Sequence, residues 1–253
     1  MNNWDELYRQ RLVIVRDKLA EWKVDGVLIS SPTNRRWLSG FTGSNGQLLI
    51  TQDCALLATD FRYYAQVAQQ SPHFTLFKHE RTPEETAVFI QTANVSTIGV
   101  EAAHTTLAMM ADLESAAADI NWISLKTIVE PLRQIKAAAE IEAICAAAAI
   151  TDLVMAQVNQ FARLGMTERQ LAWQLESAMR EAGADAMAFP VIVASGPNSA
   201  LPHHSAGKRP LQSNDPLIVD MGAMLNGYRS DMTRTFFWAT SPLSNFGTCI
   251  IWC

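Results

Sequence analysis

The chain has 253 residues, of which 49% are hydrophobic and 18% are charged, and its formal net charge is −5. This composition is typical of a globular protein, and an acidic chain without clustered basic residues argues against a nucleic-acid-binding surface. The polar start and the charges that interrupt the longest apolar run predict neither a signal peptide nor a membrane helix. Because the four cysteines (Cys54, Cys145, Cys249 and Cys253) lack CxxC spacing, we expect free thiols and a cytoplasmic location.

The first half of the chain alternates short apolar strands with amphipathic helices. Strands are expected at residues 27–30, 47–51, 54–59, 75–77 and 97–100, and helices at 4–22, 31–38, 62–70, 84–92 and 106–118. This alternation predicts an α/β domain whose mainly parallel sheet is covered by helices. The three histidines of this half have no ligand spacing and are expected at the surface: His73, His79 and His104.

The character of the sequence changes near residue 130, and we expect a domain boundary within 125–132. An alanine-rich helix is predicted from Leu132 to about Phe161. Thr167 and Gln170 form a capping box, which predicts a second helix ending at Gly183. A strand at 191–194 and a turn at 195–198 should follow.

The most informative segment, residues 216–235, predicts a hairpin. Asn226-Gly227 lies between apolar runs, and both residues tolerate the positive φ of a type I′ turn. A two-residue loop defines the register, which pairs Leu225 with Tyr228, Gly222 with Asp231, and Asp220 with Thr233.

Two aspartates become diagonal neighbours on one face of this hairpin. Asp220 and Asp231 should have Cα atoms about 7–8 Å apart. Two carboxylates at this distance can reach one metal ion, or a pair of ions about 3.5–4 Å apart. Apolar neighbours on both sides of Asp220 predict a strand buried on both faces, where a carboxylate needs a partner. The alternative is a pair of exposed aspartates that form ion pairs with Arg229 or Arg234.

Motifs in both halves of the chain resemble those of the Xaa-Pro peptidase family (prolidase, aminopeptidase P and creatinase). They lie at residues 26–29, 37–43, 59–64, 132–141, 194–203, 219–223 and 228–235. The resemblance runs from about residue 11 to 238. It implies an α/β amino-terminal domain, with a mixed sheet covered by helices, in residues 1–130. Residues 131–253 would then be the first half of an α+β pita-bread metallopeptidase domain, with an atypical tail from about 239.

The resemblance also implies an activity and a site. The family hydrolyses the bond before proline in dipeptides or short peptides, using two divalent ions that are often manganese or cobalt. By resemblance, Asp220 holds one ion, Asp231 bridges both, and His203 lines the substrate pocket and assists the tetrahedral intermediate. His204 is a weaker candidate. The implied partners are a proline-containing peptide and a second copy of the chain in a homodimer, without nucleic acid or membrane.

The chain departs from the family pattern after the second aspartate. The family carries a further histidine and two glutamates as ligands downstream, but the chain ends 22 residues after Asp231, and no His, Glu or Asp follows Trp238. We therefore expect weak metal binding and an inactive chain. A frameshift or premature stop would explain this tail, and an ordinary divergent tail is the alternative.

Other interpretations keep the scaffold but change the function. Creatinase-like amidinohydrolases use it without metals, and Asp220 and Asp231 argue against that reading. A non-catalytic peptide-binding or dimerising relative is a different class of function. A methionine aminopeptidase would usually lack the amino-terminal domain.

Overall fold

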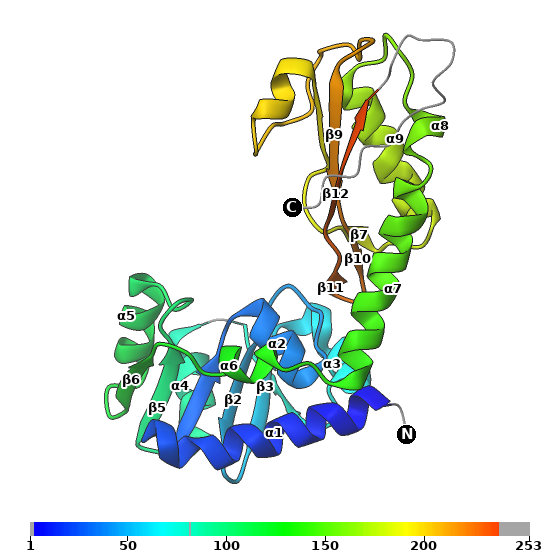
Figure 1. The fold of residues 1–253 in the computed structure, drawn as a ribbon. Helices are drawn as coiled ribbons and strands as arrows, with labels where there is room; N and C mark the ends of the chain where they lie inside the picture. The colour runs from blue at the N-terminus through cyan, green and yellow to red at the C-terminus, as the bar shows by residue number, and fades with distance from the viewer. Residues whose placement is uncertain (1–2, 81, 238–253) are drawn as a thin grey trace. The chain divides into compact units, whose positions relative to one another are not determined.

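The structure, a computed structural model, describes residues 3–80 and 82–237. The chain divides into two compact units, Met1–Ile135 and Lys136–Cys253. Figure 1 labels their helices and strands. Each unit is built around its own hydrophobic core.

The first unit contains a six-stranded sheet in the order β4-β3-β2-β1-β5-β6. Its strands are β1 (Gly26–Ile29), β2 (Gln47–Thr51), β3 (Ala55–Thr59), β4 (Thr75–Lys78), β5 (Thr97–Glu101) and β6 (Asn121–Leu125). The pairs β1–β5, β5–β6 and β3–β4 are parallel, while β1–β2 and β2–β3 are antiparallel. The sheet is therefore mixed, as predicted.

Helices cover both faces of this sheet. They are α1 (Asn3–Trp22), α2 (Pro32–Ser39), α3 (Tyr64–Gln70), α4 (Pro83–Gln91), α5 (Leu107–Ala116) and α6 (Glu130–Gln134), with a 3-10 turn, η1, at Phe61–Tyr63. Side chains alternate along a strand, so β1 contributes Val27 and Ile29 to one buried cluster and Leu28 to the other. The first cluster packs beneath α1, α2 and α3, and the second beneath α4 and α5.

One strand of this unit has no counterpart among the expected elements, and one expectation is wrong. Strand β6 was not predicted, because its polar Asn121 and Ser124 hide the apolar pattern of an edge strand. His79 was expected at the surface but is 8% exposed. Its Nε2 lies 3.1 Å from the Thr86 hydroxyl, and its ring packs against Phe77 and Phe89, so it is a core residue.

The residues of the second unit that the structure describes form two three-stranded antiparallel sheets, β11-β10-β7 and β12-β9-β8. Their strands are β7 (Ala186–Met187), β8 (Ile192–Ser195), β9 (Pro216–Met221), β10 (Ala223–Leu225), β11 (Tyr228–Arg229) and β12 (Met232–Phe237). The helices are α7 (Ala138–Met155), α8 (Val158–Phe161) and α9 (Glu168–Glu181), with a 3-10 turn, η2, at Gly196–Ala200.

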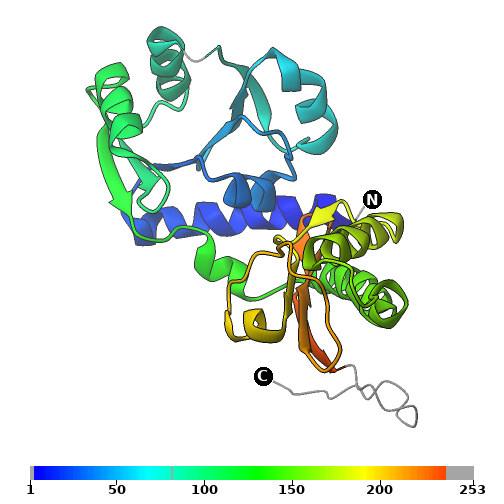
Figure 2. The ribbon, with the colours of Figure 1, turned by 90° about the horizontal axis from the view of Figure 1, so that it is seen from above.

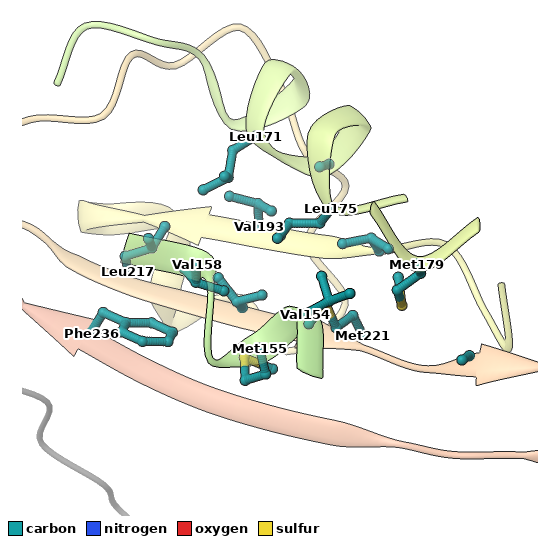
Figure 3. Packing of buried hydrophobic residues seen from close by; sticks show 14 of the residues in the cluster. Val154, Met155, Val158, Leu171, Leu175, Met179, Val193, Leu217, Met221 and Phe236 are labelled. Atoms are coloured by element: carbon teal, nitrogen blue, oxygen red, sulfur yellow. The ribbon is translucent and has the colours of Figure 1, made fainter. Parts of the chain in front are cut away.

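Helices α7 and α9 lie side by side, green and yellow-green in Figure 2. They pack against strands of both sheets and bury one face of them. Figure 3 shows this core, in which Val154 and Leu175 of the helices meet Val193 and Met221 of the strands. Along β9, Leu217, Val219 and Met221 are buried, whereas Pro216, Ile218 and Asp220 are half-buried. The strand is thus buried on one face and not on both, because the helices cover only one side of the described sheet.

The single helix expected from Leu132 to Phe161 is three helices, α6, α7 and α8. The backbone is extended at Ile135 and Ala137, and the Ala137 amide donates to Glu140 Oε2 at 2.9 Å, which starts α7 afresh. In the described chain, residues 138–161 are long and apolar enough to cross a membrane by length and composition alone. That is weak evidence, since core helices pass the same test and α7 buries one side in the unit's core.

Candidate functional site

The hairpin has the predicted turn and two of the three predicted pairs, while Gly222 and Asp231 are not paired in a ladder. Asn226 and Gly227 have φ of 50° and 78°, as a type I′ turn requires. Leu225 pairs with Tyr228 and Asp220 with Thr233, which confirms these two predicted pairs.

The two predicted strands are each broken in the middle, so that β9 with β12 and β10 with β11 join different sheets. Gly222 leaves the ladder and its carbonyl accepts from the Ala188 amide at 2.8 Å. The Ser230 backbone lies so close to Gly222 that a Cβ there would overlap the Ser230 carbonyl oxygen. The Ser230 hydroxyl is 2.7 Å from the Thr151 hydroxyl on α7, which ties the break to the helix.

A pocket of about 650 Å³ brings together the three predicted site residues, His203, Asp220 and Asp231. They come from the segment before β9, from β9, and from the residue before β12. The rest of its wall comes from α9, from the start of β8 with the residues before it, and from the segment after His203: Arg169, Ala172, Trp173, Glu176, Phe189, Pro190, Val191, Ile192, His204, Ser205 and Ala206. The pocket therefore has a carboxylate end and a largely apolar wall.

Asp220 carries the clearest sign of a missing partner. Its Oδ1 atom is buried and accepts no hydrogen bond from the described residues. Burial raises the pKa of the Asp220 carboxyl, and the nearby charge of Asp231 adds to this increase, against a hydrogen bond from Thr233. A cation between the two carboxylates would satisfy the orphaned oxygen and relieve the repulsion.

The alternative of aspartates paired with arginines is not what the structure shows. Among the described residues, no ion pair joins Asp220 or Asp231 to Arg229 or Arg234, and Arg234 donates to the Thr233 carbonyl instead. Within the same residues, no three His, Cys, Asp or Glu side chains gather in a metal-binding group. The fit to a metal is thus that of two carboxylates.

The two adjacent histidines have different environments. Both line the pocket, but His203 is exposed, while the His204 side chain is 13% exposed and its Nε2 lies 2.8 Å from Glu168 Oε2. Glu168, at the start of α9, is fully buried. Burial alone would raise the pKa of its carboxyl, but hydrogen bonds from Asn198, His204 and Ser195 outweigh this and lower the pKa to about 2.

Sequence reasoning missed Glu168 as a site residue. It lies inside the capping box that the sequence does show, in which Thr167 and Gln170 exchange hydrogen bonds. The capping box explains Thr167 and Gln170, and no further sequence pattern marks Glu168 as a functional residue.

Comparison with known proteins gives two family matches that follow the two units. Residues 11–135 match the Creatinase/Prolidase N-terminal domain, and residues 142–245 match Metallopeptidase family M24. An uncharacterized peptidase of Bacillus subtilis, YqhT, is 36% identical over 226 residues, covering 89% of this chain and 64% of that protein.

Solved structures agree. The Xaa-Pro dipeptidase from Bacillus anthracis superposes with a TM-score of 0.88 at 32% identity, covering 92% of this chain and 65% of that one. The X-Pro aminopeptidase from Thermotoga maritima gives 0.79 at 32% identity, covering 88% and 64%. The chain spans just under two thirds of the length of these relatives, and the predicted fold class is confirmed for the part that it includes.

Proposed function

Because the chain belongs to the Xaa-Pro peptidase family of M24 metallopeptidases, we propose that its pocket is part of a site that hydrolyses the bond before proline in dipeptides or short peptides. The observation that carries this proposal is the Asp220–Asp231 pair, in which the buried Asp220 Oδ1 accepts no hydrogen bond from the described residues. Manganese or cobalt would suit these hard oxygen ligands, and manganese is the ion we propose.

Each residue then has a role. Asp220 and Asp231 would be the residues of this chain that hold the divalent cations. When bound, divalent ions polarise the scissile carbonyl and activate water. His203 donates a hydrogen bond to the oxygen of the tetrahedral intermediate, and the apolar wall around Trp173 and Phe189 receives apolar parts of the peptide while limiting access of water.

Two carboxylates provide few of the about six donors that such ions take. We therefore propose that the 253-residue chain binds manganese weakly and turns over Xaa-Pro dipeptides slowly or not at all. The cytoplasmic location and the homodimer remain part of the proposal; the free thiols of Cys54 and Cys145 support a reducing compartment.

The test measures Mn²⁺ binding by thermal shift and Ala-Pro hydrolysis with the full chain. Mn²⁺ should raise the melting temperature of the wild type, and this gain should disappear in Asp220→Asn and Asp231→Asn but not in Asp112→Asn, an exposed aspartate of α5. An equal Mn²⁺ gain in all four proteins would contradict the metal site. Rapid turnover by the wild type would contradict the claim of weak binding.

A non-catalytic peptide-binding function is the second candidate. It is favoured by the absence, among the described residues, of a third ligand beside a pocket with an apolar wall. Binding of Ala-Pro in the presence of EDTA, undiminished in Asp220→Asn, would support this function over the peptidase.

A further inference from the structure

Glu168 is a fully buried carboxylate with five hydrogen-bond donors. Its Oε1 accepts from the Ser195 amide and hydroxyl, both at 2.8 Å, and from Asn198 Nδ2 at 3.0 Å. Its Oε2 accepts from His204 Nε2 at 2.8 Å and from the Gly207 amide at 3.1 Å. Such a carboxylate is fully satisfied and remains charged at neutral pH, so it contributes to the site by holding its donors and not by transferring protons.

All five donors belong to one stretch of chain, the segment 195–207, which leads from the end of β8 past both histidines. The carboxyl end of this segment and the residues just after it are also bound to the start of α9. The Arg169 amide donates to the Gly207 carbonyl and the Glu168 amide to the Arg209 carbonyl, each at 3.0 Å. Apart from η2, this segment has no regular secondary structure. The hydrogen bonds to Glu168 and to the start of α9 therefore hold it in place.

His203 depends on this arrangement because its own side chain is exposed on the pocket wall. Its neighbour His204 also lines the pocket, but its Nε2 donates to Glu168. We propose that Glu168 is a positioning residue, whose buried carboxylate holds the segment 195–207 so that His203 stays on the wall of the pocket. Any effect of Glu168 on catalysis rests on the proposed function, whereas its effect on the position of His203 does not.

The experiment follows the ring resonances of His203 by NMR in the full chain, first without metal and then with Mn²⁺. In Glu168→Gln, the amide nitrogen cannot accept from His204 and Gly207. The His203 resonances should shift and narrow toward those of a mobile side chain, and their broadening by Mn²⁺ should fall several-fold. Glu176→Gln is the matched control, since it also removes one carboxylate charge from α9, at a residue that lines the pocket but makes none of the hydrogen bonds that join Glu168 to the segment 195–207.

Unchanged His203 resonances in a folded Glu168→Gln protein would overturn the proposal. If that variant does not fold, Asn198→Ala decides, because it removes one of the five donors at a distance of five residues from His203. A change at His203 supports the proposal and no change overturns it. Absence of Mn²⁺ broadening in the wild type would contradict the proposed metal site, and the metal-free spectra would still decide the role of Glu168.

Discussion

At the scale of single residues, Asp220 and Glu168 are carboxylates whose surroundings shift their pKa values in opposite directions. Glu168 is wholly buried but receives five hydrogen bonds, so its charged form is favoured. Asp220 is only half-buried, yet one of its oxygens has no donor among the described residues and a second carboxylate lies nearby. The number of donors, and not the depth of burial, separates a supporting charge from a charge that needs a cation.

The first prediction concerns Asp220 without metal. Burial and Asp231 raise its pKa, so the charged carboxylate is less favourable in the folded protein than in the unfolded chain. Asp220→Asn should therefore increase the free energy of unfolding in EDTA, by on the order of 0.5 kcal/mol for a partly exposed charge pair. Urea unfolding in EDTA tests this, with Asp112→Asn as a neutral control. A marked loss of stability in Asp220→Asn would argue against repulsion.

The second prediction concerns Glu168 and pH. Its pKa is about 2 in the folded protein against an ordinary value of 4.5. Since the folded-state pKa is depressed, the stabilisation is fully present above about 4.5 and is lost as the pH falls toward 2, and it amounts to about 3 kcal/mol. Urea unfolding at pH 7, 5 and 3 should show a flatter pH profile for Glu168→Gln than for the wild type. Glu176→Gln should keep the wild-type slope.

At the scale of elements, the break in the hairpin is where the structure is least tolerant. Gly222→Ala would drive a Cβ into the Ser230 carbonyl and should destabilise the protein by about 1–3 kcal/mol, as overpacking does. Gly207→Ala is the control, since its Cβ would meet its nearest atom at an ordinary 3.5 Å. Equal melting temperatures for the two variants would mean that the break can relax.

The hydroxyl pair at the break gives another prediction. The Thr151 and Ser230 hydroxyls lie 2.7 Å apart, and both accept from the Ala223 amide, at 3.1 and 3.0 Å. Thr151→Val and Ser230→Ala should each cost about 1–2 kcal/mol. Because they remove the same interaction, the double variant should cost less than the sum by at least about 0.5 kcal/mol. Strict additivity in urea unfolding would show that the hydroxyls act separately.

The sequence predicted some elements in detail and others not at all. The hairpin register was predictable because Asn226-Gly227 decides it locally, and both confirmed pairs follow from that turn. The break at Gly222 was not, since it depends on Thr151, far away in sequence. Strands β6 and β7 carry weak patterns, and Glu168 meets donors 27 to 39 residues further along the chain. The apolar pocket wall from α9 is likewise a product of tertiary packing.

At the scale of the whole molecule, the first unit has the content of an independent folding unit. It has two buried hydrophobic clusters, and hydrogen bonds join α6, at its carboxyl end, to α2. Asn34 donates to Glu130 Oε1 at 2.6 Å and accepts from Arg133 at 2.8 Å, while Ile128 and Val129 are buried in the first cluster. The chain up to residue 135 therefore completes the core.

The corresponding prediction compares two fragments. Residues 1–135 should unfold cooperatively in urea on their own. Residues 1–125, which lack Ile128, Val129 and the contacts of α6, should be less stable or lose the cooperative transition. Equal stability of the two fragments would contradict the role assigned to α6, and loss of cooperativity in both would contradict independent folding of the unit.

The short distance along the chain between Asp220 and Asp231 has a consequence for the folding pathway. Ten residues, which include the two-residue turn, separate them, so closing this loop costs little entropy and the pair forms without help from distant segments. The residues that surround the pair, on α9 and the approach to β8, come from much earlier in the chain. We expect the two negative charges to meet before the pocket exists, which makes the rate of folding, and not only the final stability, sensitive to ions that screen them.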